Sequence, residues 1–174
     1  MPELVRAFIA VKLPGNITDE LENFLSELKP LAKIRWVKKE NMHITLKFLG
    51  EIPHDVLEDV KEKLSHMKYF PAFDVELSYI GAFPNLNAPR VLWLSGDTGK
   101  NELVSLAAKV NDVLDLPKEK YTPHLTLARL KDTYLPEELV RKLGTVKTMR
   151  FSCGELFLMR SILTQKGPLY SVIL

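Results

Sequence analysis

The stretches NMHITLK and TPHLTLA both contain the arrangement His-apolar-Thr-Leu, and their histidines, His43 and His124, are 81 positions apart. In an extended strand, residues i and i+2 point to the same face and lie about 6.6 Å apart. His43 and Thr45 are therefore expected on one face of one strand, and His124 and Thr126 on one face of another. The apolar residues between them point to the opposite face, which predicts a rigid hydrophobic backing for each pair.

Two imidazoles and two hydroxyls, with no carboxylate between them, suit a general acid and a general base on opposite sides of one reacting centre. Because the unperturbed pKa of histidine is about 6.5, a neutral and a protonated ring coexist near neutrality. Hydroxyl groups donate hydrogen bonds to the non-bridging oxygens of a phosphate. The residues thus predict in-line displacement at phosphorus without a metal or another cofactor, and their symmetry leaves open which histidine is the acid.

Other catalytic arrangements fit the sequence less well. A zinc site needs three or four ligands, and neither motif offers a third. His54 and His66 have polar, helical surroundings and no paired spacing, so we interpret them as surface residues. The sequence contains neither the nucleophile elbow of serine hydrolases nor a glycine-rich phosphate loop of the Walker type.

Length and composition indicate one domain of ordinary size, or two small lobes that share a core. The 174 residues are 46% hydrophobic and 26% charged, and the net charge of +2 excludes a strongly basic tail but leaves room for a local basic patch. Cys153 is the single cysteine, which excludes an internal disulfide and favours a reducing compartment. The sequence lacks a signal peptide and a membrane-spanning stretch, so we expect a cytoplasmic monomer that does not bind membranes.

The hydrophobic patterns predict strands and helices in a mixed order. Strands are expected over residues 5–13, 34–37, 42–49, 73–80, 91–94, 124–130, 150–163 and 169–174. Helices are expected from a capping box at Asp19 and Glu22 to Pro30, after Pro53, from Asn101 to Leu114, and from Pro136 to Gly144. Because strands outnumber helices and often follow one another, the order favours an α+β fold with mostly antiparallel sheets. One motif lies in each half, which suggests that the two motif strands face each other.

Together with the two motifs, five segments make the chain similar to the two-histidine phosphoesterases. Within that superfamily it most resembles the RNA 2′,3′-cyclic phosphodiesterases, also described as 2′-5′ RNA ligase-like proteins. The segments are RAFIAVKLP at 6–14, RWVKKENMHITLKFLGEI at 35–52, FPNLNAPRVLWL at 83–94, YTPHLTLARL at 121–130 and SILTQKGPLYSVIL at 161–174. They follow one another in order along essentially the whole chain.

The resemblance implies a single bilobal domain, residues 1–174, with two intertwined lobes and one motif in each. A pseudo-twofold axis is implied to relate the lobes around a central cleft, with helices on the outer faces. His43 is implied to protonate the leaving ribose 3′-oxygen and His124 to act as base on the attacking water. Thr45 and Thr126 are implied to hold the phosphate. The implied substrate is an RNA end with a 2′,3′-cyclic phosphate, and the implied product is a 2′-phosphate.

Three alternative functions stay open at this point. The resemblance extends to ATP-independent ligases, which join tRNA halves with 2′,3′-cyclic phosphate and 5′-hydroxyl ends through a 2′-5′ linkage. It also extends to enzymes that hydrolyse small cyclic nucleotides or 2′-5′ oligoadenylates. Finally, a protein of this fold can bind RNA without catalysis, although two intact motifs argue against that function.

Two residues next to the motifs are candidate substrate contacts. Lys47 continues the alternation of His43 and Thr45, which predicts either a phosphate contact or a solvated lysine at the end of a strand. Arg129 lies out of phase with the second motif unless its strand bulges, yet it belongs to a segment that resembles the family.

The sequence also offers groups that suit the rest of an RNA chain. A basic rim that follows an RNA backbone is predicted from Arg35, Lys38, Lys39, Arg90, Arg160 and Lys166. Aromatic rings that can stack on an unpaired base are Phe48, Tyr121 and Phe83, although core packing is favoured for Phe48.

Overall fold

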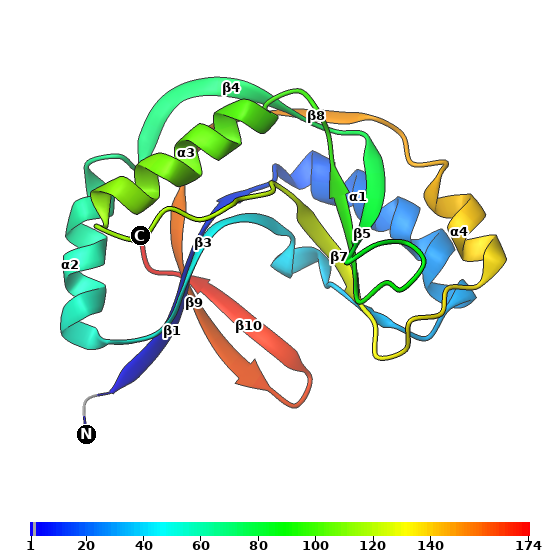
Figure 1. Ribbon diagram of the computed structural model, residues 1–174, viewed down its shortest axis with the longest axis horizontal. Helices are drawn as coiled ribbons and strands as arrows, with labels where there is room; N and C mark the ends of the chain where they lie inside the picture. The colour runs from blue at the N-terminus through cyan, green and yellow to red at the C-terminus, as the bar shows by residue number, and fades with distance from the viewer. Residues whose placement is uncertain (2) are drawn as a thin grey trace.

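A computed structural model describes Met1 and residues 3–174, and these residues form an α+β fold (Figure 1). The strands are β1 (Leu4–Lys12), β2 (Arg35–Trp36), β3 (His43–Pro53), β4 (Tyr69–Leu77), β5 (Tyr79–Phe83), β6 (Val91–Ser95), β7 (Leu125–Arg129), β8 (Met149–Glu155), β9 (Phe157–Thr164) and β10 (Gly167–Val172). The α-helices are α1 (Gly15–Leu28), α2 (His54–Ser65), α3 (Lys100–Val113) and α4 (Glu137–Leu143), and short 3-10 turns cover Lys29–Leu31 and Lys39–Asn41.

Two antiparallel sheets contain these strands. The main sheet has eight strands in the order β10-β9-β1-β3-β7-β6-β5, with β2 also paired to β7, and the second sheet consists of β4 and β8. The prediction of an α+β fold with antiparallel sheets is therefore confirmed. The two motif strands, β3 and β7, are neighbours at the centre of the main sheet. The presence of one motif in each half of the chain had suggested that these strands face each other.

The helices lie in two pairs beside the sheet. Helices α2 and α3 contact each other and the strand β3, whereas α1 and α4 contact each other on the far side of β7 in Figure 1. Helix α1 follows β1 in sequence but packs against α4 and β8 from the second half of the chain. The two halves of the sequence therefore share one core.

Strand β1 has buried side chains on both faces of the main sheet. Val5, Ile9 and Val11 belong to the large core cluster and are at most 5% exposed, as their alternate spacing requires. Phe8 and Ala10 point to the other face and form a small second cluster with Met159. We call these the core face and the motif face, because the motif histidines lie on the second one.

Both predicted helix starts that rested on a capping side chain were wrong. Helix α1 begins at Gly15, four residues before Asp19, and Asp19 forms an ion pair with Lys39 instead of a cap. Ile17 is buried, so the apolar face of α1 continues upstream of the predicted capping box. Helix α3 is preceded by Gly99, and Asn101 lies within its first turn. A local capping pattern is a weaker signal than the length of the apolar face.

Two long predicted strands are each divided in the structure. The stretch 73–80 breaks at Ser78 between β4 and β5, and the stretch 150–163 breaks at Leu156 between β8 and β9. Each break carries the chain from the small sheet to the main sheet. Alternation of apolar residues continues through such corners, so the sequence pattern shows the strand but not the change of sheet.

Candidate functional site

The two motif strands meet through a single residue pair. Ile44 of β3 lies opposite Leu125 of β7 in an antiparallel register, and both side chains are almost completely buried on the core face. The neighbours of this pair therefore lie on the motif face. Among the residues that the structure describes, regular pairing between β3 and β7 is limited to this position, so the two strands meet at the centre of the motifs.

The antiparallel register places each histidine across from the threonine of the other motif. Continuing from the central pair, His43 lies opposite Thr126, and Thr45 lies opposite His124. Side chains that are directly opposite on neighbouring strands have Cβ atoms about 4.5–5.5 Å apart. The four groups thus form the corners of a small quadrilateral, with the imidazoles on one diagonal and the hydroxyls on the other. The structure brings together the four residues that the sequence singled out.

His43 is held by hydrogen bonds at both ring nitrogens. Its Nδ1 lies 2.6 Å from the main-chain oxygen of Asn41, and its Nε2 lies 2.9 Å from Thr45 Oγ1. A carbonyl oxygen only accepts, so Nδ1 carries a hydrogen and Nε2 of the neutral ring accepts from the threonine hydroxyl. Asn41 is itself buried, and its side-chain Nδ2 donates to the oxygen of Pro168 on β10 over 3.0 Å.

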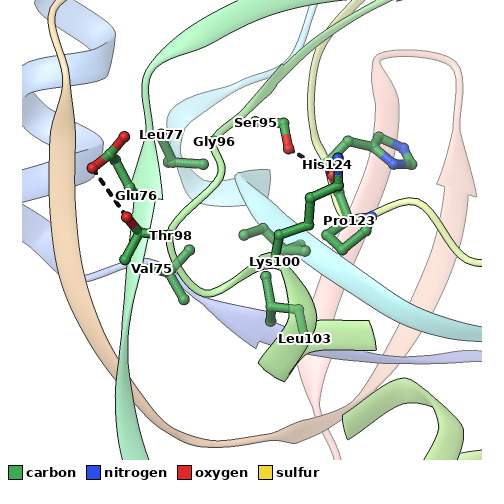
Figure 2. Close-up of a pocket in the computed structure, with 11 residues that line it drawn as sticks. Val75, Glu76, Leu77, Ser95, Gly96, Thr98, Lys100, Leu103, Pro123 and His124 are labelled. Atoms are coloured by element: carbon green, nitrogen blue, oxygen red, sulfur yellow. Dashed lines mark hydrogen bonds between the residues drawn. The ribbon is translucent and has the colours of Figure 1, made fainter. Parts of the chain in front are cut away.

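In the second motif, His124 makes the same main-chain hydrogen bond through its Nδ1. Its Nδ1 lies 2.7 Å from the main-chain oxygen of Thr122, which again leaves Nε2 as the acceptor of the neutral ring. Ser95 Oγ donates to the oxygen of Pro123 over 2.8 Å and so fixes the backbone just before the histidine (Figure 2). In Figure 2 the imidazole points away from the small pocket beneath this strand. Both rings therefore present Nε2 to whatever lies on the motif face.

The loop that supports Pro123 depends on a close backbone approach. A Cβ atom at Gly96 would lie 2.1 Å from the main-chain oxygen of Glu76, so only glycine fits between β6 and β4. Thr98 Oγ1 donates to the Glu76 carboxylate over 3.3 Å and closes the same loop (Figure 2). The loop is thus fixed next to Ser95, whose hydrogen bond to Pro123 positions the start of the second motif.

Aromatic rings border both histidines. The centroid of His43 lies 4.8 Å from that of Phe8 and 5.3 Å from that of Tyr170, which meets it edge to face at 82°. The centroid of His124 lies 4.9 Å from that of Phe83, also edge to face, at 90°. These apolar walls restrict water around the imidazoles and hold each ring in one orientation.

The surroundings lower the pKa of both histidines. For His43 the main cause is burial, opposed by the hydrogen bond to Asn41 and reinforced by the positive charges of His124 and Arg129. For His124 burial again dominates, opposed by the bond to Thr122 and reinforced by Arg129. Without an anion the site therefore favours neutral rings. A bound phosphate opposes that preference, because its negative charge stabilises an imidazolium.

A β-bulge in β7 brings Arg129 to the motif face. Two consecutive residues of β6 pair with Ala128 and Thr126, which leaves Leu127 as an extra residue in β7. Leu127 and Ala128 are both fully buried, so the alternation moves by one place after the motif. Arg129 is exposed and acts electrostatically on both histidines, as expected for a side chain on their face.

Arg129 has a second arginine as its direct neighbour. Arg35 of β2 lies opposite Arg129 in the register, so the two side chains share one face. Like charges that are directly opposite in a sheet destabilise it, unless an anion lies between them. Two adjacent guanidinium groups at this edge of the motif face have the charge and the donors that suit a phosphate group.

A corresponding bulge in β3 turns Lys47 away from the motif face. Ala10 pairs with Thr45 and Ile9 pairs with Lys47, so Leu46 is an extra residue. Ile9 is fully buried on the core face, and Lys47 shares its side. The Lys47 side chain is only 11% exposed, and its Nζ lies 2.8 Å from a carboxylate oxygen of Glu119. The structure does not bring Lys47 together with the four motif residues.

The residue after Lys47 takes its place on the motif face. Phe48 pairs with Phe8, the ring centroids are 6.1 Å apart, and Phe48 is 65% exposed. The expectation that Phe48 packs in the core was therefore wrong. Tyr121 instead packs against the core and donates from its hydroxyl to the oxygen of Thr45 over 2.9 Å. Phe48 and Arg129 both lie five residues after a motif histidine, so the two bulges are equivalent.

The remaining histidines do not join the site. His54 and His66 are exposed, as the sequence indicated. Within Met1 and residues 3–174, no group of three His, Cys, Asp or Glu side chains is placed to hold a metal ion. In the same part of the chain, no helix combines the length and the apolar character that crossing a membrane requires.

Sequence comparison finds similar proteins over nearly the whole chain. The sequence model of the family described as LigT like Phosphoesterase matches residues 11–93 and 96–170. The RNA 2′,3′-cyclic phosphodiesterase of Methanocaldococcus jannaschii is 36% identical over 176 residues, covering 97% of this chain and 98% of that protein. The protein of the same name from Archaeoglobus fulgidus is 36% identical over 172 residues, covering 95% of this chain and 96% of that protein.

Solved structures show the same fold. E. coli LigT in complex with 3′-AMP superposes with a TM-score of 0.79 at 22% identity, covering 99% of this chain and 97% of that one. The protein TT0787 of Thermus thermophilus superposes with a TM-score of 0.77 at 28% identity, covering 97% of this chain and 95% of that one.

Proposed function

Because the chain belongs to the LigT-like phosphoesterase family, we propose that it hydrolyses 2′,3′-cyclic phosphodiester ends of RNA to 2′-phosphate ends by two-histidine acid–base catalysis. The observation that carries this proposal is the antiparallel pairing of the motifs, which sets two imidazoles diagonally across two hydroxyls. The names of the similar proteins support the substrate class.

The phosphate is held between the two strands. The hydroxyls of Thr45 and Thr126 lie on the second diagonal and donate to its non-bridging oxygens. Arg129, whose charge lowers the pKa of both imidazoles, neutralises the phosphate and the charge that develops in the transition state. The phosphate in turn raises both pKa values, so bound substrate favours the imidazolium that proton donation requires.

Each histidine uses Nε2 for proton transfer. His43 as imidazolium gives its Nε2 proton to the departing 3′-oxygen, and neutral His124 takes a proton from the attacking water. The P–O bond from water forms as the bond to the 3′-oxygen breaks, which leaves the phosphate on the 2′-oxygen. Both Nδ1–H groups stay on main-chain carbonyls, so neither ring has to turn. The assignment of acid and base follows the family resemblance.

The test of this function is product mapping in the presence of a chelator. An oligoribonucleotide that ends in a 2′,3′-cyclic phosphate is incubated with the protein and excess EDTA. We expect turnover at the rate seen without EDTA, and a product that ends in a 2′-phosphate. A 3′-phosphate product, or loss of activity with EDTA, would contradict the mechanism. Adding an oligonucleotide with a 5′-hydroxyl identifies ligation, since a 2′-5′-joined product then appears.

Phe48 is expected to bind the base of the terminal nucleotide. Its ring is 65% exposed, and the centroid of Phe8 lies 6.1 Å from that of Phe48 and 4.8 Å from that of His43. Stacking of a base on an aromatic ring contributes about 1–3 kcal/mol. Phe48→Ala should therefore raise KM about 5- to 100-fold, with a much smaller change in kcat.

The matched control is Tyr69→Ala. Tyr69 is 72% exposed, but it lies on β4 of the small sheet. It should leave KM unchanged, and neither variant should shift the thermal unfolding midpoint by more than a few degrees. An unchanged KM for Phe48→Ala would show that the ring does not contact the base.

A further inference from the structure

Tyr170 of β10 lies against the first histidine. Its ring meets His43 edge to face at 5.3 Å and Phe8 at 4.9 Å, and it belongs to the small apolar cluster on the motif face. The β9–β10 hairpin that carries it is tied to the first motif, because Asn41 Nδ2 donates to the oxygen of Pro168. The ring is thus held in place from two directions.

The two histidines have aromatic neighbours that differ by one hydroxyl group. Phe83 borders His124 edge to face at 4.9 Å, and Tyr170 borders His43 in the same manner at 5.3 Å. Packing alone would be served equally by phenylalanine at both places. The hydroxyl of Tyr170 therefore requires an explanation that packing does not supply.

The surroundings of this hydroxyl suit the donation of a hydrogen bond to an anion. Across the described residues, the Tyr170 hydroxyl has no hydrogen-bond partner in the protein, whereas the hydroxyl of Tyr121 has one. Burial raises the pKa of Tyr170, opposed by the charges of Arg129 and Arg6, so the group stays protonated. Both arginines that act on Tyr170 are positive and therefore attract an anion to the same place.

We infer that the Tyr170 hydroxyl is a third phosphate donor of the site and contacts a non-bridging oxygen beside His43 and Arg129. This inference rests on the proposed function and adds to it a residue outside both motifs. It also breaks the local symmetry of the site: the half that contains His43 has two hydroxyl donors and the half that contains His124 has one.

The first test compares Tyr170→Phe with Tyr79→Phe on a 2′,3′-cyclic phosphate substrate. Tyr170→Phe keeps the ring contacts to Phe8 and His43, so the thermal midpoint should not change. A hydrogen bond to a charged group is strong enough for kcat/KM to fall about 10- to 100-fold. Tyr79 is 37% exposed and contacts Trp93, and removal of its hydroxyl should leave kcat/KM unchanged.

The second test identifies the atom that Tyr170 contacts. Each of the two diastereomers of a 2′,3′-cyclic phosphorothioate replaces one non-bridging oxygen by sulfur, which is a poor hydrogen-bond acceptor. We expect the sulfur effect on kcat/KM at one diastereomer to be smaller in Tyr170→Phe than in the wild type, because the bond is already absent. Equal sulfur effects in both proteins, or an unchanged rate for Tyr170→Phe beside an active wild type, would overturn the inference.

Binding of uridine 2′-monophosphate separates this inference from the proposed function. If the wild type does not hydrolyse the cyclic phosphate, the proposed function fails. Calorimetry with the monophosphate still tests the contact, since Tyr170→Phe should bind it at least about fivefold more weakly. Equal affinity for the two proteins would exclude Tyr170 as a phosphate donor.

Discussion

Replacement of His43 or His124 by alanine is expected to lower kcat roughly 10²- to 10⁴-fold, the range for loss of a general acid or base. The two rings lie on one diagonal of the motif quadrilateral, so neither takes over the position of the other. The double variant should be little slower than either single one, because the proton transfers belong to one transition state. The measurement is the single-turnover rate of the two single variants and the double variant on an RNA 2′,3′-cyclic phosphate.

The matched control is His54→Ala. His54 is an exposed histidine at the start of α2 and should keep the wild-type rate. Circular dichroism and thermal unfolding then separate a loss of chemistry from a loss of fold. Near-wild-type turnover in either motif variant would show that its histidine is neither acid nor base.

A change of leaving group distinguishes the acid from the base. In a ribonucleoside 2′-(p-nitrophenyl phosphate), the leaving phenolate needs little protonation. The variant that lacks the acid should therefore recover much of its loss on this substrate, and the variant that lacks the base should not. We expect recovery for His43→Ala. Recovery for His124→Ala instead would exchange the two roles and leave the rest of the site unchanged.

The core of this site could be predicted from the sequence because it depends on the simplest property of a strand. Alternation alone places His43 with Thr45 and His124 with Thr126, and the buried Ile44 and Leu125 confirm that the intervening residues form the backing. The antiparallel meeting of the motifs follows from long-range sheet pairing, which no local pattern contains.

The residues that flank the motifs could not be placed in the same way. Strict alternation places Lys47 on the motif face and Phe48 on the core face. An extra residue in β3 exchanges these positions, so that Phe48 lies on the motif face and Lys47 on the core face. In β7, the buried Ala128 stands where alternation would place a third site residue after His124 and Thr126, and Arg129 replaces it. A bulge depends on the pairing of a strand with its neighbours, so it appears only once those neighbours are known.

Alignment of the two motifs identifies a pair of equivalent residues that strand alternation does not select. At the offset of 81 that aligns the histidines, Phe48 coincides with Arg129, and both return to the motif face after their bulge. The equivalent bulges place the fifth residue after each histidine on the motif face, where the proposed function puts the substrate. The two side chains differ as the proposed function requires, with an aromatic ring for a base in one half of the site and a guanidinium for phosphate in the other.

Replacement of Arg129 by alanine should lower kcat/KM about 10- to 100-fold and also move the pH profile. The loss of rate follows from removal of a charged hydrogen-bond donor to the phosphate. Arg129 helps to lower the pKa of both histidines, after the larger effect of burial. Removal of its positive charge stabilises both imidazolium forms, so both pKa values rise. Both limbs of the bell-shaped profile of kcat/KM should shift to higher pH.

Two control variants separate these effects. Arg129→Lys keeps the charge but loses the two-pronged guanidinium, so it should keep the wild-type pH profile while recovering only part of the rate. Arg141→Ala removes an exposed arginine from α4 and should change neither quantity. Because Arg129 is exposed and lies opposite Arg35, its removal should not lower the unfolding midpoint.

The pH profile is the decisive measurement for the bulge in β7. If Arg129 pointed to the core face, its loss would change stability and leave the titration of His43 and His124 as it was. A side chain on the motif face predicts the reverse: an unchanged midpoint and two limbs that shift together toward alkaline pH. A fall in rate with an unmoved profile would mean that Arg129 binds RNA at a distance from the imidazoles. The equivalence of the two bulges would then describe the fold and not the chemistry.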